Sequence, residues 1–278
     1  MWNRLLVIGM LSTGLALADQ RPGTLIDAHS HYTATDARSL SAADIIAKLD
    51  ASGVSRVVIT GTPGHLAYEL HAHAPGRVIP VLGVYESDAD KGTWMMDRDL
   101  PARVADQLLR GGWAGIGELH LFARHAQSEV FAQLVRLADR HDLMLLLHGD
   151  PEIVDQAFAI APRIRVLWAH LGTVPEPDEV TRVLQRHADK ALWIDTSVRD
   201  ERIAPQGQLL PAWREVFEAH PDRFVVAVDA FSTRRWGRYE EVVSHIRQWV
   251  GALPPSLQER LLWRNAEALF EPWLIQRP

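Results

Sequence analysis

Residues 25–31 read Leu25-Ile26-Asp27-Ala28-His29-Ser30-His31, a short apolar run that ends in two histidines. The same form, a short apolar run followed by a polar side chain, returns along the chain. Most runs are continuous Val, Ile, Leu and Ala segments, which is typical of parallel strands covered on both faces. We therefore expect strands at residues 25–28, 56–60, 78–84, 115–118, 143–148, 164–169, 191–195 and 224–229.

Amphipathic stretches separate these strands. Ser41-Ala42-Ala43-Asp44 opens one of them with a capping pattern, and Gly53 stands where glycine ends helices. Residues 63–74 are a weaker helix candidate. The remaining helices are expected at residues 100–110, 128–141, 152–160, 178–187, 209–220, 239–250 and 256–270.

The alternation of strand and helix shows no break in composition. It predicts the α/β class, a (β/α)₈ TIM barrel in a single domain over residues 19–278. A doubly wound open sheet is the competing fold. No glycine-rich nucleotide fingerprint follows the first strand, which favours the barrel.

The amino-acid composition excludes several classes of partner and of active site. The 278 residues are 47% hydrophobic and 23% charged, which is enough for a large core. A formal net charge of −6 argues against a nucleic-acid partner, which would require a basic face. The chain has no cysteine, so a disulfide scaffold, a thiolate metal site and a cysteine nucleophile are excluded. A metal would therefore be bound by His, Asp or Glu.

The N-terminus has the pattern of a secretory signal peptide. Arg4 precedes the apolar residues 5–17, and Ala16-Leu17-Ala18 forms a small-x-small end before Asp19. The run is short for a bilayer span, which takes roughly 20 residues. We expect cleavage after Ala18 and a secreted or periplasmic protein that is not bound to a membrane afterwards. An uncleaved anchor or a buried helix is the alternative for residues 1–18.

Polar side chains stand where the predicted strands end. The carboxyl ends of barrel strands form one mouth, so these side chains should converge there. His29 and His31 are two residues apart on a strand and should point the same way. Considered alone, Asp229 could be the N-cap of a helix, and Glu118 could form a salt bridge at the rim of the barrel. Together they predict a site for Zn²⁺, with Mn²⁺, Fe²⁺ or Co²⁺ as alternatives. The converging residues are His29, His31, Glu118, His148, His170 and Asp229.

The order His-x-His, Glu, His, His, Asp on successive strands resembles the amidohydrolase superfamily of metal-dependent hydrolases. Residues 26–31, together with Arg264-Asn265-Ala266-Glu267-Ala268-Leu269-Phe270, are similar to its "amidohydrolase 2" branch, which is related to aminocarboxymuconate-semialdehyde decarboxylase. The resemblance extends from about Ile26 to Phe270. In this branch Asn265 is expected to be structural and to cap the last helix.

The resemblance implies roles for the converging residues. Asp229 and His170 would be catalytic, and the metal ligands would be His29, His31, His148 and Asp229. Some relatives carry a carboxylated lysine on strand four, but Glu118 stands there, and the only lysines are Lys48, Lys91 and Lys190. Glu118 could ligate one ion, bridge two ions or hold a ligand histidine. The number of ions, one or two, stays open.

The function implied is exported, metal-dependent hydrolysis of an amide, lactone or ester bond in a small molecule. A metal-activated water would attack, Asp229 would move the proton, and His170 would help to stabilise the oxyanion.

Two alternatives remain. The first is metal-dependent, non-oxidative decarboxylation of a small unsaturated or aromatic carboxylic acid, with the substrate carboxylate held by one of Arg124, Arg199, Arg234 and Arg235. The second is a metal-loaded binding protein without turnover. The loop at residues 86–97, with Trp94, Met95 and Met96, could be a lid, a packed plug or the contact of a homodimer.

Overall fold

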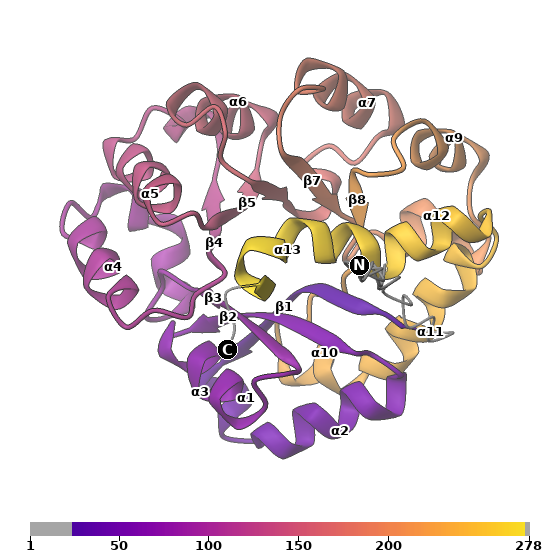
Figure 1. Cartoon of the computed structure of the whole chain (residues 1–278), viewed down its shortest axis with the longest axis horizontal. Helices are drawn as coiled ribbons and strands as arrows, with labels where there is room; N and C mark the ends of the chain where they lie inside the picture. The colour runs from indigo at the N-terminus through magenta and orange to yellow at the C-terminus, as the bar shows by residue number, and fades with distance from the viewer. Residues whose placement is uncertain (1–23, 276–278) are drawn as a thin grey trace, which may run out of the picture.

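Eight parallel strands, hydrogen-bonded in the order β1 to β8, form the centre of the computed structural model, which describes residues 24–275. Helices surround the curled sheet (Figure 1). This confirms the α/β class and a TIM-barrel-like fold. The leader predicted at residues 1–18 lies outside the described residues. The strands are β1 (Ile26–Thr33), β2 (Arg56–Thr62), β3 (Val78–Leu82), β4 (Gly115–Leu121), β5 (Met144–Gly149), β6 (Val166–Trp168), β7 (Leu192–Asp195) and β8 (Phe224–Val225).

The two ends of the sheet are joined by the residues that follow β8. Ala28 N donates to Val226 O at 3.2 Å, Asp229 N donates to His29 O at 2.7 Å, and His31 N donates to Ala230 O at 3.3 Å. The strand predicted at residues 224–229 is therefore shorter than expected, although its last residues still lie against β1. Its regular part ends early, and Asp229 has a φ of 51°, which an extended strand does not allow.

The predicted helices are present outside the sheet. Ser41 and Asp44 form the expected capping box of α2, and Gly53 ends that helix with a φ of 63°. The weak candidate at residues 63–74 is helix α3. The helices are α1 (Ala34–Ala37), α2 (Ala42–Ser52), α3 (His65–His73), α4 (Leu100–Leu108), α5 (Glu129–Arg140), α6 (Pro151–Ile160), α7 (Pro177–Arg186), α8 (Asp200–Ile203), α9 (Pro211–Ala219), α10 (Thr233–Gly237), α11 (Tyr239–Val250), α12 (Pro255–Glu259) and α13 (Asn265–Ile275).

Helix α13 closes the amino-terminal end of the barrel. It lies across the centre of the sheet in Figure 1, and its Leu269 and Phe270 pack in one cluster with Ile26, Val58 and Leu146 of the strands. This floor leaves the opposite end of the barrel, where the strands finish, as the place for a site.

The last helix, expected to be continuous over residues 256–270, is interrupted by a π-helical turn at Arg260–Arg264. The turn places Leu261 O where it accepts a hydrogen bond from Val226 N at 3.2 Å. Asn265 is structural, but it acts on the sheet rather than as a cap: its Nδ2 donates to Pro221 O and Phe224 O at 2.9 and 2.8 Å. Both contacts hold the floor helix against β8.

The loop at residues 86–97 packs down beside β4. Trp94 and Met95 are buried, and Trp94 Nε1 donates to His120 O at 2.9 Å. Ser128 Oγ donates to Met95 O at 2.7 Å, while the neighbouring Met96 is 64% exposed. Of the three roles considered for this loop, the packed plug agrees with these contacts. The homodimer stays a prediction.

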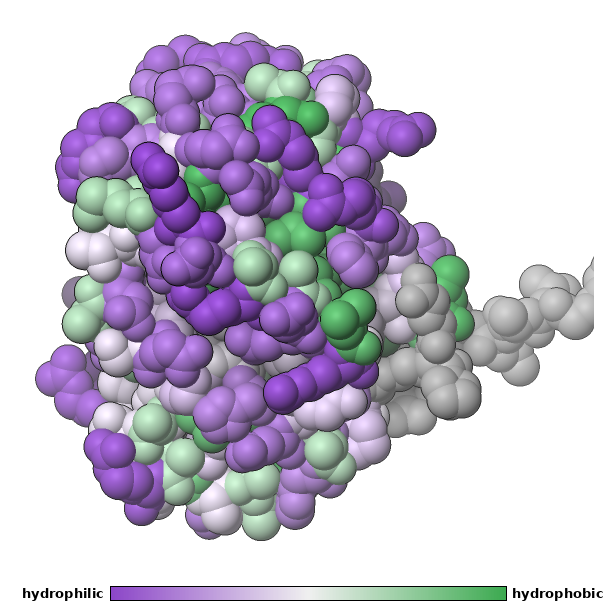
Figure 2. Space-filling view, turned by 90° about the vertical axis from the view of Figure 1, so that its left-hand side faces the viewer, coloured by the Kyte–Doolittle hydropathy of each residue, from purple (hydrophilic) through white to green (hydrophobic). Residues whose placement is uncertain are grey.

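The outer surface follows the amphipathic pattern of the helices. In α5, residues such as Phe131 and Leu134 are buried against the sheet while Glu129 and Arg140 face outward. The side of the molecule that carries α4 and α5 is accordingly mostly hydrophilic, with isolated hydrophobic side chains (Figure 2). Over residues 24–275, none of the helices combines the length and the apolar character that crossing a bilayer requires.

Asp200 provides a pH-dependent contribution to stability. It begins α8 and is buried, and its Oδ1 accepts a hydrogen bond from Trp249 Nε1 of α11 at 3.3 Å. Burial raises the pKa of Asp200 to about 6, although Trp249, His245 and Arg235 act in the opposite direction. The folded protein therefore binds this proton more tightly than the unfolded chain. The resulting stability is fully present below about pH 4 and is lost as the pH rises through about 6.

The substitution Asp200→Asn keeps an oxygen acceptor for Trp249 but needs no proton. We expect it to raise the free energy of unfolding at pH 8 by up to about 3 kcal/mol and to have little effect at pH 4. Urea unfolding of both proteins at the two pH values measures this. An equal change at pH 4 and pH 8 would contradict the assignment.

Candidate metal centre

Six side chains meet at the carboxyl ends of the strands. His29 Nε2 and His31 Nε2 lie 3.1 Å apart, and His31 Nε2 lies 3.2 Å from Asp229 Oδ1 and 3.3 Å from Glu118 Oε2. All four residues are buried. The other two, His148 at the end of β5 and His170 just after β6, reach the same cluster through Glu118. The structure thus brings together all six residues singled out by the sequence.

An irregularity in β1 lets both histidines face inward. Ile26 and Ala28 belong to the interior cluster, so strict alternation would turn His29 outward. The pairing of β1 with β2 shifts register between Asp27 and Ser30, which resets the alternation. The simple two-residue spacing predicted the right pair, but the shift in register is what directs it inward.

Glu118 lies between two pairs of histidines. Its Oε1 accepts from His148 Nδ1 at 2.7 Å and lies 3.2 Å from His170 Nε2, while its Oε2 faces the two histidines of β1. The preceding Gly117 has a φ of 144°, and a Cβ there would stand 2.5 Å from Leu146 O of β5. Only glycine allows this approach, which sets the position of Glu118.

Asp229 is held by hydrogen bonds on both sides. Asp27 Oδ1 accepts from Val228 N at 2.9 Å, and Ser30 Oγ accepts from Ala230 N at 3.0 Å. Asp27 Oδ2 in turn accepts from Ser30 Oγ at 2.7 Å and from the Tyr239 hydroxyl at 2.8 Å. The amides that flank Asp229 are therefore fixed by β1, which stabilises the left-handed conformation that aims its carboxylate at the histidines.

Asp195, at the end of β7, is a site residue that the sequence reasoning missed. His29 Nδ1 donates to Asp195 Oδ2 at 3.0 Å. Asp195 Oδ1 accepts from His170 N at 3.1 Å and from Ser197 Oγ at 2.5 Å, and Ser197 Oγ lies 2.8 Å from His170 Nδ1. One carboxylate thus orients two imidazoles so that their Nε2 atoms face the centre. The available signal was its position, because Asp195 ends a strand as the other site residues do.

His120 extends the cluster toward the plug. Its Nε2 lies 3.6 Å from Glu118 Oε2, its ring stacks on His148 with centroids 4.3 Å apart, and the Tyr85 hydroxyl accepts from its backbone N at 2.8 Å. Burial lowers the pKa of His120 to about 4, so the ring is neutral near pH 7. Neutral imidazole is the form that binds metals.

The cluster favours positive charge at its centre. Burial lowers the pKa of His29, but Glu118 and Asp195 outweigh it and raise that pKa well above its usual range. Burial likewise raises the carboxyl pKa values, yet the surrounding histidines hold the pKa of Glu118 well below its usual range and that of Asp229 at about 2. The carboxylates are therefore ionised and require cationic partners.

The residues present fit a divalent cation. Asp229 Oδ1 is buried without a hydrogen-bond partner, although His31 Nε2 is close by. Imidazole nitrogens and carboxylate oxygens form the donor set that Zn²⁺, Mn²⁺, Fe²⁺ and Co²⁺ accept. Within residues 24–275, three groups have donor atoms within 4.8 Å of one another: His29, His31 and Asp229; His29, Glu118 and His170; and Glu118, His120 and His148.

Comparison with known proteins gives a family and a fold. A family model described as amidohydrolase matches residues 26–271. No curated protein is similar enough in sequence to count as a match. A probable 2-pyrone-4,6-dicarboxylic acid hydrolase from Acinetobacter baumannii, with citric acid bound, aligns with a TM-score of 0.63 and 16% identity over 89% of this chain and 99% of that chain.

Two further solved structures share this architecture. An amidohydrolase from Burkholderia multivorans with bound zinc aligns with a TM-score of 0.57 and 16% identity over 89% of this chain and 99% of that chain. An organophosphorus hydrolase from Deinococcus radiodurans aligns with a TM-score of 0.57 and 13% identity over 89% of this chain and 92% of that chain. At such low identity the likeness shows a common fold.

Replacing Asp195 tests its orienting role. In Asp195→Asn the amide could donate to His29 Nδ1 and favour the wrong tautomer, so we expect Zn²⁺ to bind about 10- to 100-fold more weakly. Competition with a chromophoric chelator measures the affinity. Asp155→Asn is the matched control, because Asp155 accepts from His187 Nε2 at 2.7 Å outside the cluster. Equal affinity in both variants would show that Asp195 does not support the site.

Proposed function

Because the chain belongs to the amidohydrolase family, we propose that it is a metal-dependent hydrolase acting on an amide, lactone or ester bond of a small molecule. The observation that carries the proposal is the convergence of six imidazole and carboxylate side chains at the open end of the barrel. The pyrone dicarboxylic acid hydrolase and the organophosphorus hydrolase among the similar structures support hydrolysis. The signal-like residues 1–18 support export as part of the same proposal.

We further propose which residues hold the cation. His29, His31 and Asp229 form one of two fully buried donor groups, and Glu118 links them to His148 and His170. The zinc in the Burkholderia multivorans structure supports Zn²⁺ as the first choice. A bound divalent cation would polarise a substrate carbonyl and lower the pKa of water. Because Glu118 contacts both histidine pairs, the donor set suits either one ion or two.

Asp229 is the residue proposed to move the proton. Its Oδ1 faces the histidines of β1, while its Oδ2 lies 3.9 Å from His170 Nε2. One oxygen can thus stay with the cation site while the other takes the proton of the attacking water and returns it to the leaving group. Hydrogen bonds from Val228 N and Ala230 N to β1 keep the carboxylate in this position.

His170 is proposed to stabilise the oxyanion. Ser197 binds its Nδ1, and Asp195 accepts from its backbone N, so the ring is fixed with Nε2 toward Glu118 and Asp229. A donor held in place before the reaction stabilises developing negative charge without the cost of reorientation. Leu146 and Leu167, which are buried beneath the cluster, exclude water from that side.

Metal content tests the site. Elemental analysis of the purified protein is expected to find one or two equivalents of Zn or another divalent ion. The variant His29→Ala/His31→Ala is expected to lose the metal, because it removes the two imidazole ligands that β1 provides. The control His73→Ala/His141→Ala changes two exposed histidines and should keep the metal. Failure to bind Zn²⁺, Mn²⁺, Fe²⁺ or Co²⁺ after loading with each would overturn the proposal.

Turnover tests the role of Asp229. In Asp229→Asn we expect hydrolysis of a panel of aryl esters, lactones and anilides to fall about 100- to 10,000-fold, because the amide cannot accept the proton. Metal content is measured in the same sample. If the ion is lost, His170→Gln provides the second test. Unimpaired hydrolysis would refute the role of Asp229, and release of carbon dioxide from aromatic or unsaturated acids would favour decarboxylation instead.

A further inference from the structure

Two arginines at the mouth of the barrel are anchored to the backbone beside the candidate catalytic residues. Arg199, in the loop after β7, donates through Nε to His170 O at 3.1 Å. Arg235, in the short helix α10 that follows β8, donates through Nε and Nη2 to Val228 O at 3.2 and 2.8 Å. Both are half-buried. The guanidinium of Arg199 is therefore held at His170, and that of Arg235 is held at Val228, the residue before Asp229.

These two arginines differ from their neighbours in having no carboxylate partner. Arg202 pairs with Glu176, and Arg238 pairs with Glu241 through two hydrogen bonds of 2.8 and 2.5 Å. Among residues 24–275, no Asp or Glu lies within ion-pair distance of Arg199 or Arg235. A half-buried guanidinium with only a backbone carbonyl as partner retains donors for an anion.

Arg124 and Arg234 do not share this arrangement. Arg124 is exposed and lies over the ring of Phe122, with 5.6 Å between the guanidinium carbon and the ring centroid. Arg234 is also exposed. Of the four arginines that the sequence offered for holding a substrate carboxylate, the structure therefore separates Arg199 and Arg235 as the two that are fixed near the site.

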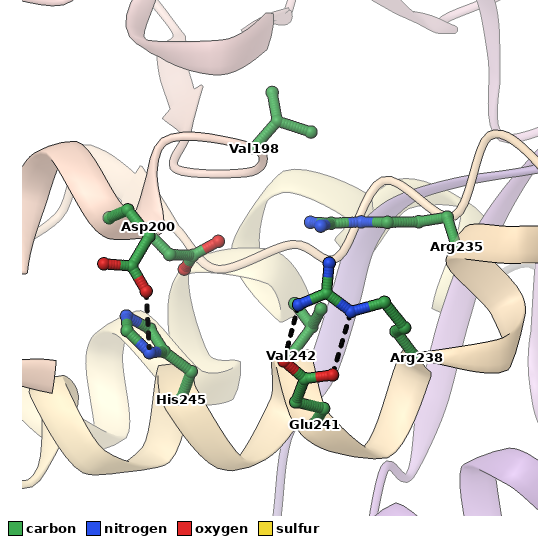
Figure 3. Close-up of a pocket in the computed structure, with 8 residues that line it drawn as sticks. Val198, Asp200, Arg235, Arg238, Glu241, Val242 and His245 are labelled. Carbon is green, nitrogen blue, oxygen red and sulfur yellow. Dashed lines mark hydrogen bonds and ion pairs between the residues drawn. The ribbon is translucent and has the colours of Figure 1, made fainter. Parts of the chain in front are cut away.

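Arg235 extends into a cavity of about 170 Å³ between the loop after β7 and helices α10 and α11 (Figure 3). Val198 stands on the opposite wall, and the Arg238–Glu241 pair lies below. The other carboxylates there are engaged: Glu201 lies 3.7 Å from His245 Nδ1, and Asp200 accepts from Trp249. Arg235 lowers the pKa of Asp200 and Glu241 through space, but among the described residues no carboxylate of the cavity forms a direct ion pair with it.

Exposed apolar side chains lie near the two arginines in sequence, in the segments that follow β7 and β8. Val198 precedes Arg199 and is 36% exposed, and Phe231 lies two residues beyond Asp229 and is 50% exposed. Phe231 N donates to Asp229 O at 2.9 Å, which keeps this residue next to the cluster. A fixed cation beside exposed apolar side chains suits an organic anion better than an inorganic one.

We propose that Arg199 and Arg235 bind the carboxylate of an organic-acid substrate whose apolar part contacts Val198 and Phe231. This assignment rests on the proposed hydrolase function, because it places the scissile bond at Asp229 and His170. The planar guanidinium matches a carboxylate with two parallel hydrogen bonds, and partial burial strengthens them. The anchors at His170 O and Val228 O set the distance from the bound carboxylate to the reacting groups.

Binding of phenylacetate and its neutral isostere phenylacetamide to the metal-loaded protein tests the assignment. By titration calorimetry, we expect the Kd for phenylacetate to rise about 10- to 100-fold in both Arg199→Gln and Arg235→Gln, because each variant loses hydrogen bonds to a charged group. Phenylacetamide should bind weakly and equally to all three proteins. Arg238→Gln is the matched control, since Arg238 lines the same cavity but is already paired, and its Kd should not change.

An unchanged Kd for phenylacetate in both glutamine variants would overturn the assignment, as would equal binding of phenylacetate and phenylacetamide to the unaltered protein. If a glutamine variant unfolds, the corresponding lysine variant replaces it, and a Kd between those of the arginine and glutamine proteins supports the assignment. Metal content and hydrolysis of neutral esters are measured on the same samples. If they persist while anion selectivity is absent, only the arginine assignment fails, whereas absence of metal from the unaltered protein refutes the hydrolase function itself.

Discussion

The ionised carboxylate of Glu118 is the interaction on which the candidate centre depends. A buried carboxylate keeps its charge only if positive or hydrogen-bonding groups surround it, and His29, His31, His148 and His170 do so from three strands. Two of those imidazoles, His29 and His170, are oriented in turn by Asp195 and Ser197. The whole arrangement is a set of charges that is balanced only when positive charge, from protons or from a cation, occupies its centre.

The framework that holds these charges is built from apolar runs. Parallel strands end at the same edge of a barrel. Polar residues that follow the apolar runs therefore lie close together at that edge, however far apart they are in the sequence. Helix α13 fills the other end with Leu269 and Phe270, so the barrel interior is packed below the site. The packed apolar residues that stabilise the barrel thus lie at one end of the strands, and the candidate metal centre lies at the other.

Much of this could be predicted from the sequence because it depends on local patterns. The eight strands, the α2 capping residues Ser41 and Gly53, and the six converging side chains all follow from runs and their end points. The resemblance to amidohydrolases is confirmed by the family match over residues 26–271. The ligand and catalytic roles stay predictions. Partners distant in sequence were missed: Asp195 acts on His29 across the barrel, and the π-helical turn serves a contact with Val226.

The barrel is closed by contacts between the two ends of the described chain. Ala28, His29 and His31 of β1 bond to residues 226–230, and the floor comes from α13. Neither contact exists while only the first two hundred or so residues have left the ribosome. The partly made chain therefore has strands but no enclosed core, and the candidate centre, which needs Asp229 beside His31, is assembled among the last events of folding.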